Sequence, residues 1–126
     1  MAINILVVDD SAVVRAMILK TLSASGVEVG EAYQASNGRE GLEQLAQHWI
    51  DVAFVDINMP VMNGEEMIAE ARANPLWADL PIVVVSTEGS ETRIQRLREK
   101  GAHFVHKPFS PEAIRDIVNS IIGAMP

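Results

Sequence analysis

The apolar residues of the chain fall into short runs that alternate with longer segments of mixed polarity. Three of these runs are almost wholly apolar and rich in β-branched residues, at 3–8, 52–55 and 82–85. Such runs are typical of strands buried on both faces, as in a parallel sheet. Two weaker strand candidates occur at 27–33 and 103–106. The pattern therefore predicts five strands.

The segments between these runs carry apolar residues at the spacing of a helix face. We expect five helices, which run from Ser11 to Gly26, over 38–47, over 65–73, over 90–100 and from Ser110 onward. Ser11 and Ser110 can cap the helices that follow them, because a serine hydroxyl accepts a hydrogen bond from a free backbone N–H of the first turn. Gly26 can end the first helix in a left-handed conformation.

Strands and helices that alternate in this way predict an α/β fold with a parallel sheet and helices on both faces. Right-handed crossovers leave few topologies, and the strand order 2-1-3-4-5 is a common one for a doubly wound sheet of five strands. The length of 126 residues fits one domain. No repeat, linker or low-complexity segment is evident, so residues 1–126 are predicted to be a single domain without an output domain.

Composition narrows the classes of function. The chain has no cysteine, which excludes a disulfide framework or a thiolate metal site and suits a reducing compartment. The N-terminus does not have the pattern of a signal peptide, and no apolar run approaches the roughly 20 residues needed to span a bilayer. We therefore expect a cytoplasmic protein without membrane insertion. The formal net charge of −7 disfavours contact with nucleic acid, which requires a basic face.

Polar side chains follow four of the predicted strands. Asp9 and Asp10 come after the first strand, Asp56 after the third, Ser86 after the fourth and Lys107 after the fifth. The carboxyl ends of parallel strands meet at one edge of the sheet, and ligands bind there at the point where the strand order reverses. Residues far apart in the sequence are therefore expected to share one crevice.

Three carboxylates in one crevice repel one another unless a cation lies among them. Mg²⁺, or Mn²⁺ in its place, prefers oxygen ligands of this kind. Asp56 could then act as a nucleophile toward phosphorus and form an aspartyl phosphate. Lys107 is a point charge suited to a phosphate oxygen, and the Ser86 hydroxyl can donate to another. Each residue alone has an ordinary explanation, such as a helix cap or a loop acid, so the prediction depends on their joint placement.

This ordered set resembles the receiver domain of two-component response regulators over almost the whole chain. The resembling segments are the acidic pair Asp9-Asp10, the phosphorylation loop 56–64, the switch hydroxyl Ser86 and the pair Lys107-Pro108. The resemblance implies a flavodoxin-like, CheY-like fold. It also implies a signalling switch rather than an enzyme, with self-phosphorylation and self-dephosphorylation as its only chemistry.

The resemblance also implies a role for each residue of the site. Asp56 would accept a phosphoryl group from a phosphohistidine on a sensor histidine kinase. Asp10 would bind the metal ion directly and Asp9 mainly through water, and Asp56 and the backbone carbonyl of Asn58 would complete the protein ligands. Lys107 would contact the phosphoryl group once it is attached.

Other positions would transmit or time the signal. Ser86 would move toward the phosphoryl group, and Phe104 would turn inward as the switch aromatic of the surface formed by the fourth helix, fifth strand and fifth helix. Asn58 and Glu88 would contact the attacking water and tune dephosphorylation, as in the chemotaxis regulators that this part of the sequence resembles. The resemblance further implies a cis peptide bond between residues 107 and 108.

Alternatives of other classes stay open at this point. A metal-dependent phosphohydrolase with an aspartate nucleophile would usually need a second acid where this chain has Asn58. A receiver-like interaction module that no longer turns over phosphate would have no need of the complete site. A flavodoxin-like nucleotide binder would need a glycine-rich phosphate turn in place of Asp9-Asp10-Ser11. The sequence identifies neither the kinase, a phosphatase nor the downstream target, and it is compatible with a monomer or a weak dimer.

Two further groups of side chains are expected to have structural roles only. Charged residues fill most of 90–100, and we interpret them as a solvated helix face in preference to a surface that binds a partner. Trp49 and Trp77 are expected to cover the edges of the core.

Overall fold

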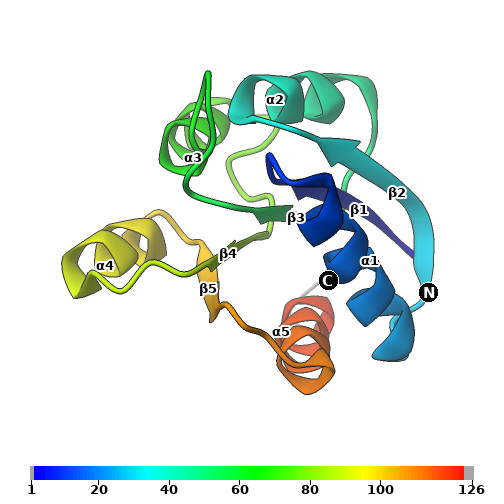
Figure 1. The fold of residues 1–126 in the computed structure, drawn as a ribbon. Helices are drawn as coiled ribbons and strands as arrows, with labels where there is room; N and C mark the ends of the chain where they lie inside the picture. The colour runs from blue at the N-terminus through cyan, green and yellow to red at the C-terminus, as the bar shows by residue number, and fades with distance from the viewer. Residues whose placement is uncertain (1, 124–126) are drawn as a thin grey trace.

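The computed structural model describes residues 2–123. Strands and helices alternate along this part of the chain (Figure 1). Their bounds are β1 Ile3–Val8, α1 Ala12–Ala24, β2 Val29–Ala35, α2 Gly38–Gln47, β3 Val52–Val55, α3 Gly64–Ala73, β4 Ile82–Ser86, α4 Glu91–Glu99, β5 His103–His106 and α5 Pro111–Gly123. The predicted alternation of five strands with five helices is confirmed.

The five strands form one sheet in the order β2-β1-β3-β4-β5, and every neighbouring pair is parallel. Figure 1 shows α1 and α5 on one face of the sheet and α2, α3 and α4 on the other. The predicted doubly wound fold is therefore confirmed. Because the order reverses between β1 and β3, the loops after these two strands open a crevice at the carboxyl edge.

Both faces of the sheet are buried, which explains the continuous apolar runs of the central strands. Successive side chains of a strand point to opposite faces. In β1, Leu6 and Val8 join the core beneath α2, α3 and α4, whereas Ile5 and Val7 join the core beneath α1 and α5. Ile18 of α1 packs in that second core. The sheet therefore separates two apolar cores.

The helix ends follow the predicted signals. The Ser11 hydroxyl accepts from the backbone N–H of Val14, and Gly26 has a φ of +87° after the end of α1. The Ser110 hydroxyl accepts from the backbone N–H of Ala113 at 3.1 Å. Asn63 begins α3 with a reciprocal capping box and was not among the expected caps.

Two expectations about the apolar pattern are wrong. The edge strand β2 lies at Val29–Ala35, two residues later than 27–33, because only Ala35 at its end is fully buried and its middle offers little apolar signal. Trp49 leaves 77% of its surface exposed, so it does not cover the core edge, although its indole N–H donates to Asp51 at 3.0 Å. Trp77 is partly buried and packs against the core as expected.

Within 2–123 no helix combines the length and the apolar content that crossing a membrane requires.

Candidate functional site

The carboxyl edge of the sheet brings the predicted acidic residues together. Asp9 and Asp10 follow β1, and Asp56 follows β3, its neighbour in the sheet. One carboxylate oxygen from each of the three lies within 4.8 Å of the others. Asp9 and Asp56 are buried, with 2% and 9% of their surfaces exposed, and Asp10 is exposed. The crevice that the strand order implied is therefore lined by acids.

Asp9 is fixed through both its backbone and its side chain. Its backbone N–H donates to the carbonyl of Ala35 in β2 at 3.1 Å. One carboxylate oxygen accepts from the backbone N–H of Ser11 at 2.9 Å, at the start of α1. The guanidinium of Arg15, one turn into α1, donates to the Asp9 carbonyl and to the Gln34 side chain. Arg15 thus supports the site, and sequence reasoning missed it because an arginine at a helix start has no distinctive pattern.

Asp56 is held at the end of β3 and is electrostatically strained. Its backbone N–H donates to Val8 at 2.9 Å, and its own Oδ1 accepts from the backbone N–H of Ile57 at 2.9 Å. Burial raises the pKa of the Asp56 carboxyl above its usual range, and the nearby acids Asp9 and Asp10 raise it further. The charge of Lys107 and the hydrogen bond from Ile57 offset only part of this increase.

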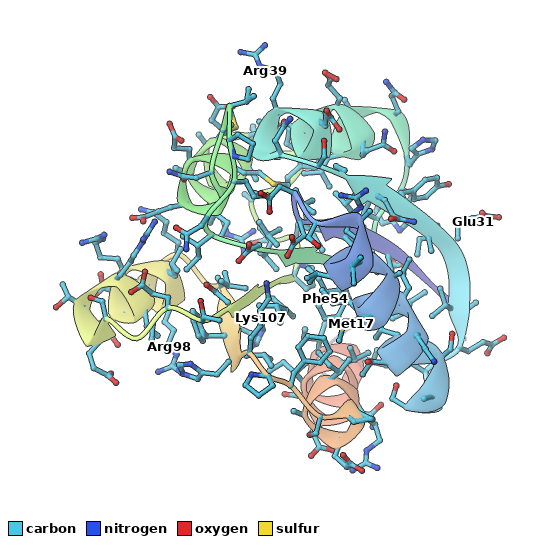
Figure 2. All side chains as sticks on the ribbon, in the orientation of Figure 1. Met17, Glu31, Arg39, Phe54, Arg98 and Lys107 are labelled. Atoms are coloured by element: carbon cyan, nitrogen blue, oxygen red, sulfur yellow. The ribbon has the colours of Figure 1, made fainter. Side chains whose placement is uncertain are left out.

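Lys107 reaches the acidic cluster from the far strand β5. Its backbone N–H donates to the carbonyl of Ser86 at 2.9 Å, and its peptide bond to Pro108 is cis. The ammonium Nζ lies 3.2 Å from Asp9 Oδ2 and 3.8 Å from Asp56 Oδ1. Figure 2 shows the Lys107 side chain near the centre of the molecule, at the carboxyl edge of the sheet. The ammonium group therefore pairs with two of the three clustered carboxylates, those of Asp9 and Asp56.

Ser86 closes the site at the end of β4. The residue is fully buried, and its hydroxyl accepts from the backbone N–H of Glu88 at 3.2 Å. The Glu88 carboxylate accepts from the backbone N–H of Ser90 at 3.0 Å and pairs with Arg93 at 2.9 Å. Asn58 is exposed, and its side chain has no hydrogen-bond partner within residues 2–123. The two residues predicted to tune dephosphorylation therefore differ: Glu88 is tethered and Asn58 is free.

The loop after β3 packs tightly against Asp56. The backbone N–H of Gly64 donates to Ile57 at 2.9 Å. A Cβ at position 64 would collide with the backbone carbonyl of Asp56, so only glycine fits this close approach. Within the loop, the backbone N–H of Met62 donates to the carbonyl of Pro60 at 2.7 Å, and Val61 between them has a φ of +66°. The loop thus holds the acidic residue through backbone contacts.

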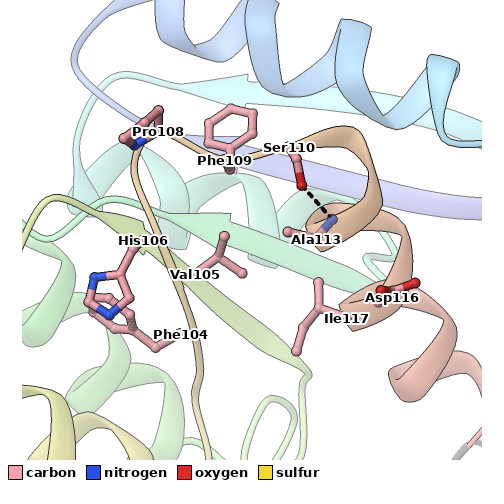
Figure 3. A pocket seen from close by; sticks show the side chains of 9 residues that line it. All are labelled: Phe104, Val105, His106, Pro108, Phe109, Ser110, Ala113, Asp116 and Ile117. Carbon is pink, nitrogen blue, oxygen red and sulfur yellow. Dashed lines mark hydrogen bonds between the residues drawn. The ribbon is translucent and has the colours of Figure 1, made fainter.

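The predicted switch aromatic lies on β5, beyond Ser86. Phe104 is half-buried, packs against the core beneath α2, α3 and α4, and meets His106 edge to face with ring centroids 4.7 Å apart. Both residues line a pocket of about 540 Å³ with Pro108, Phe109 and α5 (Figure 3). Phe104 therefore lies between the core and a surface pocket, where a change in its rotamer would alter that surface.

The site fits a divalent cation with oxygen ligands. Three clustered carboxylates against one ammonium leave a formal excess of two negative charges, of which Asp9 and Asp56 carry theirs in buried positions. A divalent ion would balance that excess, and hard oxygen donors are what Mg²⁺ prefers. Asp9, Asp10 and Asp56 are the side chains placed to hold it.

Comparison with known proteins agrees with this geometry. Residues 5–119 match the family model of the response regulator receiver domain. The chain belongs to the receiver domain family. It is 33% identical to chemotaxis protein CheY1 of Helicobacter pylori over 122 residues, which cover 95% of this chain and 97% of that protein. Chemotaxis protein CheY of Thermotoga maritima is 33% identical over 120 residues, which cover 94% of this chain and 96% of that protein.

Solved structures place the chain in the same group. The structure of chemotaxis protein CheY4 of Vibrio cholerae matches with a TM-score of 0.84 at 33% identity, covering 96% of this chain and 99% of that one. The protein is thus a CheY-like receiver domain. Receiver domains are signalling proteins rather than classical enzymes; they bind Mg²⁺ through acidic residues and interact with histidine kinases and downstream targets. The phosphohydrolase alternative finds no support among these relatives.

Proposed function

We propose that this receiver domain is switched by phosphorylation of Asp56, with Mg²⁺ or Mn²⁺ held by Asp9, Asp10, Asp56 and the backbone carbonyl of Asn58. The observation that carries the proposal is the cluster of three carboxylates within 4.8 Å of one another beside the Lys107 ammonium group. Burial of two carboxylates costs free energy unless a cation compensates their charge. Packing of the core alone therefore does not explain why Asp9 and Asp56 are buried together.

The phosphodonor is a phosphohistidine of a sensor kinase. A carboxylate oxygen of Asp56 forms a bond to phosphorus while the bond from phosphorus to the histidine nitrogen breaks, and the imidazole keeps that electron pair and takes up a proton. The metal ion, when bound, neutralises charge on the phosphoryl oxygens. Lys107 provides a second positive charge, and the Ser86 hydroxyl donates to a phosphoryl oxygen.

Output follows from the movement of Ser86. The attached group adds close to two negative charges and strong acceptor oxygens at Asp56. When Ser86 moves toward them, the end of β4 shifts and Phe104 turns further into the core. The surface of α4, β5 and α5 changes with it, including the pocket beside Phe104. A downstream protein that prefers this form would shift the two-state balance.

Residues 1–126 act as one cytoplasmic domain, as a monomer or a weak dimer, with a kinase, a downstream protein and a phosphatase as partners. Nucleic acid is not a partner, because the formal net charge is −7. The relatives named above are chemotaxis proteins, which favours a chemotaxis pathway.

The proposal is tested by incubation with acetyl phosphate, with and without Mg²⁺, followed by intact-mass measurement. We expect a single phosphoryl adduct that requires Mg²⁺ and is absent in Asp56→Asn. Asp116→Asn, which alters an exposed acid on α5, is the matched control and should form the adduct. Absence of the adduct in the unaltered protein with either metal would instead favour an interaction module that no longer turns over phosphate.

A further inference from the structure

A network of ion pairs joins α4 to the two segments that border the phosphoacceptor. Arg93 of α4 pairs with Glu88 after β4 at 2.9 Å and with Glu65 of α3 at 3.0 Å. Arg96, one turn further along α4, pairs with Glu65 at 3.3 Å. The side chains of Arg93, Glu65 and Glu88 are each about a quarter exposed or less. The expectation of a solvated face on α4 is therefore wrong for Arg93, which pairs with two acids.

Both acids of this network lie on segments that adjoin the site. Glu65 follows Gly64, whose backbone packs against the Asp56 carbonyl. Glu88 lies two residues after Ser86, and its backbone N–H donates to the Ser86 hydroxyl. Glu88 thus lies on the loop that follows β4, the sheet neighbour of the strand that ends at the phosphoacceptor.

The carboxylate of Glu88 is nevertheless turned toward α4. One oxygen accepts from Arg93 at 2.9 Å and the other from the backbone N–H of Ser90 at 3.0 Å. These partners also lower the pKa of Glu88, the Ser90 N–H first and Arg93 after it. Within residues 2–123, the acidic cluster of the site comprises only Asp9, Asp10 and Asp56. Glu88 is therefore held outside that cluster as a weak base.

We propose that Arg93 is a positioning residue that prolongs the lifetime of the phosphoryl group by holding the Glu88 carboxylate on α4. The inference rests on the proposed phosphorylation of Asp56. Arg93 pairs with Glu88 and Glu65 and with none of the three clustered carboxylates, so it acts on the site through Glu88.

The chemistry of hydrolysis explains the direction of the effect. The oxygen of a water molecule forms a bond to phosphorus, the bond from phosphorus to Asp56 breaks, and Asp56 leaves as a carboxylate. The water must also lose a proton, and a nearby carboxylate can accept it as a general base. A Glu88 that is tethered through both oxygens is a poor acceptor, whereas a released Glu88 is a stronger base and free to approach.

The test compares the decay of the phosphoryl adduct after acetyl phosphate is removed, in the presence of Mg²⁺. We expect Arg93→Ala to shorten the lifetime about three- to tenfold, a small part of what a positioned general base contributes. Arg93→Lys should restore part of the lifetime, because it keeps the charge. These ion pairs are partly exposed at the surface rather than in the core, so each variant is expected to fold.

Two comparisons separate positioning from a general structural role. Arg98→Ala is the matched control, because Arg98 lies exposed on the same helix and points away from the site (Figure 2). It should leave the lifetime unchanged. In a Glu88→Gln background, Arg93→Ala should have no further effect, since the base is already removed.

Failure of Arg93 as a positioning residue and failure of the phosphorylation switch give different results. A lifetime that Arg93→Ala leaves unchanged would overturn the inference, as would an equal shortening in the Glu88→Gln background, while adduct formation would still support the switch. If the unaltered protein forms no adduct at all, the proposed function fails and the inference fails with it.

Discussion

The ammonium group of Lys107 lies closer to Asp9 than to Asp56, at 3.2 Å from one carboxylate and 3.8 Å from the other. Asp9 is also the more deeply buried of the two acids. In the metal-free protein, Lys107 therefore neutralises mainly Asp9. A divalent ion that binds the acidic cluster competes with Lys107 for Asp9. That competition would leave the lysine free to face a group attached to Asp56.

Replacement of Lys107 tests this relationship. Lys107→Ala leaves the buried Asp9 carboxylate without its charged partner, and we expect metal-free stability to fall by about 1–3 kcal/mol. Saturating Mg²⁺ should recover part of the loss, because the ion supplies the missing positive charge. Urea unfolding with and without Mg²⁺ measures both quantities, with Lys20→Ala on the exposed face of α1 as the control. A loss that Mg²⁺ does not reduce would show that Lys107 and the ion do not share this role.

The raised pKa of Asp56 predicts a pH-dependent stability. Because the folded-state pKa lies above the ordinary value of 3.8, the folded protein holds the Asp56 proton more tightly than the unfolded chain. Ionised Asp56 thus destabilises the metal-free fold at neutral pH. Asp56→Asn should raise stability there, and the gain should vanish as the pH falls through the raised pKa toward 3.8. Urea unfolding across this range is the measurement; a gain that is the same at every pH would contradict the cause given.

Binding of Mg²⁺ should stabilise the protein through the same carboxylates. An ion that binds only the folded state contributes about 2.7 kcal/mol when its concentration is 100 times its Kd. Asp10 is the exposed member of the cluster, so Asp10→Asn should weaken the binding of Mg²⁺ without disturbing the core. We expect a smaller Mg²⁺-induced rise in Tm for this variant than for the unaltered protein. Equal rises would remove Asp10 from the ligand set.

Val61 occupies a backbone conformation that suits other residues better. Its φ of +66° lies in the left-handed region, although its side chain is β-branched and 76% exposed. Asparagine tolerates this region, so Val61→Asn should stabilise the fold by about 1 kcal/mol. Val13→Asn is the control, because Val13 is also exposed but lies in α1, and it should be neutral or slightly destabilising. Denaturant midpoints with unchanged m-values would report the difference. A lower midpoint for Val61→Asn would mean that the valine side chain stabilises the loop.

The sequence predicted the fold well because the sheet is covered on both faces. Buried runs such as 52–55 leave no polar positions, and parallel strands separated by helices allow few orders. The edge strand β2 was misplaced because burial there is confined to one end. Trp49 was misjudged because it is a large apolar residue that is expected to be buried. Its indole N–H instead donates to Asp51 at the surface.

The candidate site was predictable only as far as the backbone determines it. The strand-end rule brings Asp9, Asp56 and Lys107 to one edge whatever their rotamers. The direction of Glu88 depends instead on Arg93, which lies on another element and carries no signal beyond its charge. Contacts between side chains of different elements are the part that periodicity does not encode.

The close approach of Gly64 to Asp56 gives the last prediction. A methyl group at position 64 would collide with the Asp56 backbone carbonyl, and backbone obstacles cannot rotate away as flexible side chains can. We expect Gly64→Ala to cost about 1–3 kcal/mol, as for other overpacked sites. The same shift should displace Asp56 and slow formation of its phosphoryl adduct. Gly89→Ala is the matched control, because a Cβ there meets nothing within 4 Å, and it should be neutral or slightly stabilising. If both variants have equal stability and equal adduct formation, the loop has room to relax and the contact does not position Asp56.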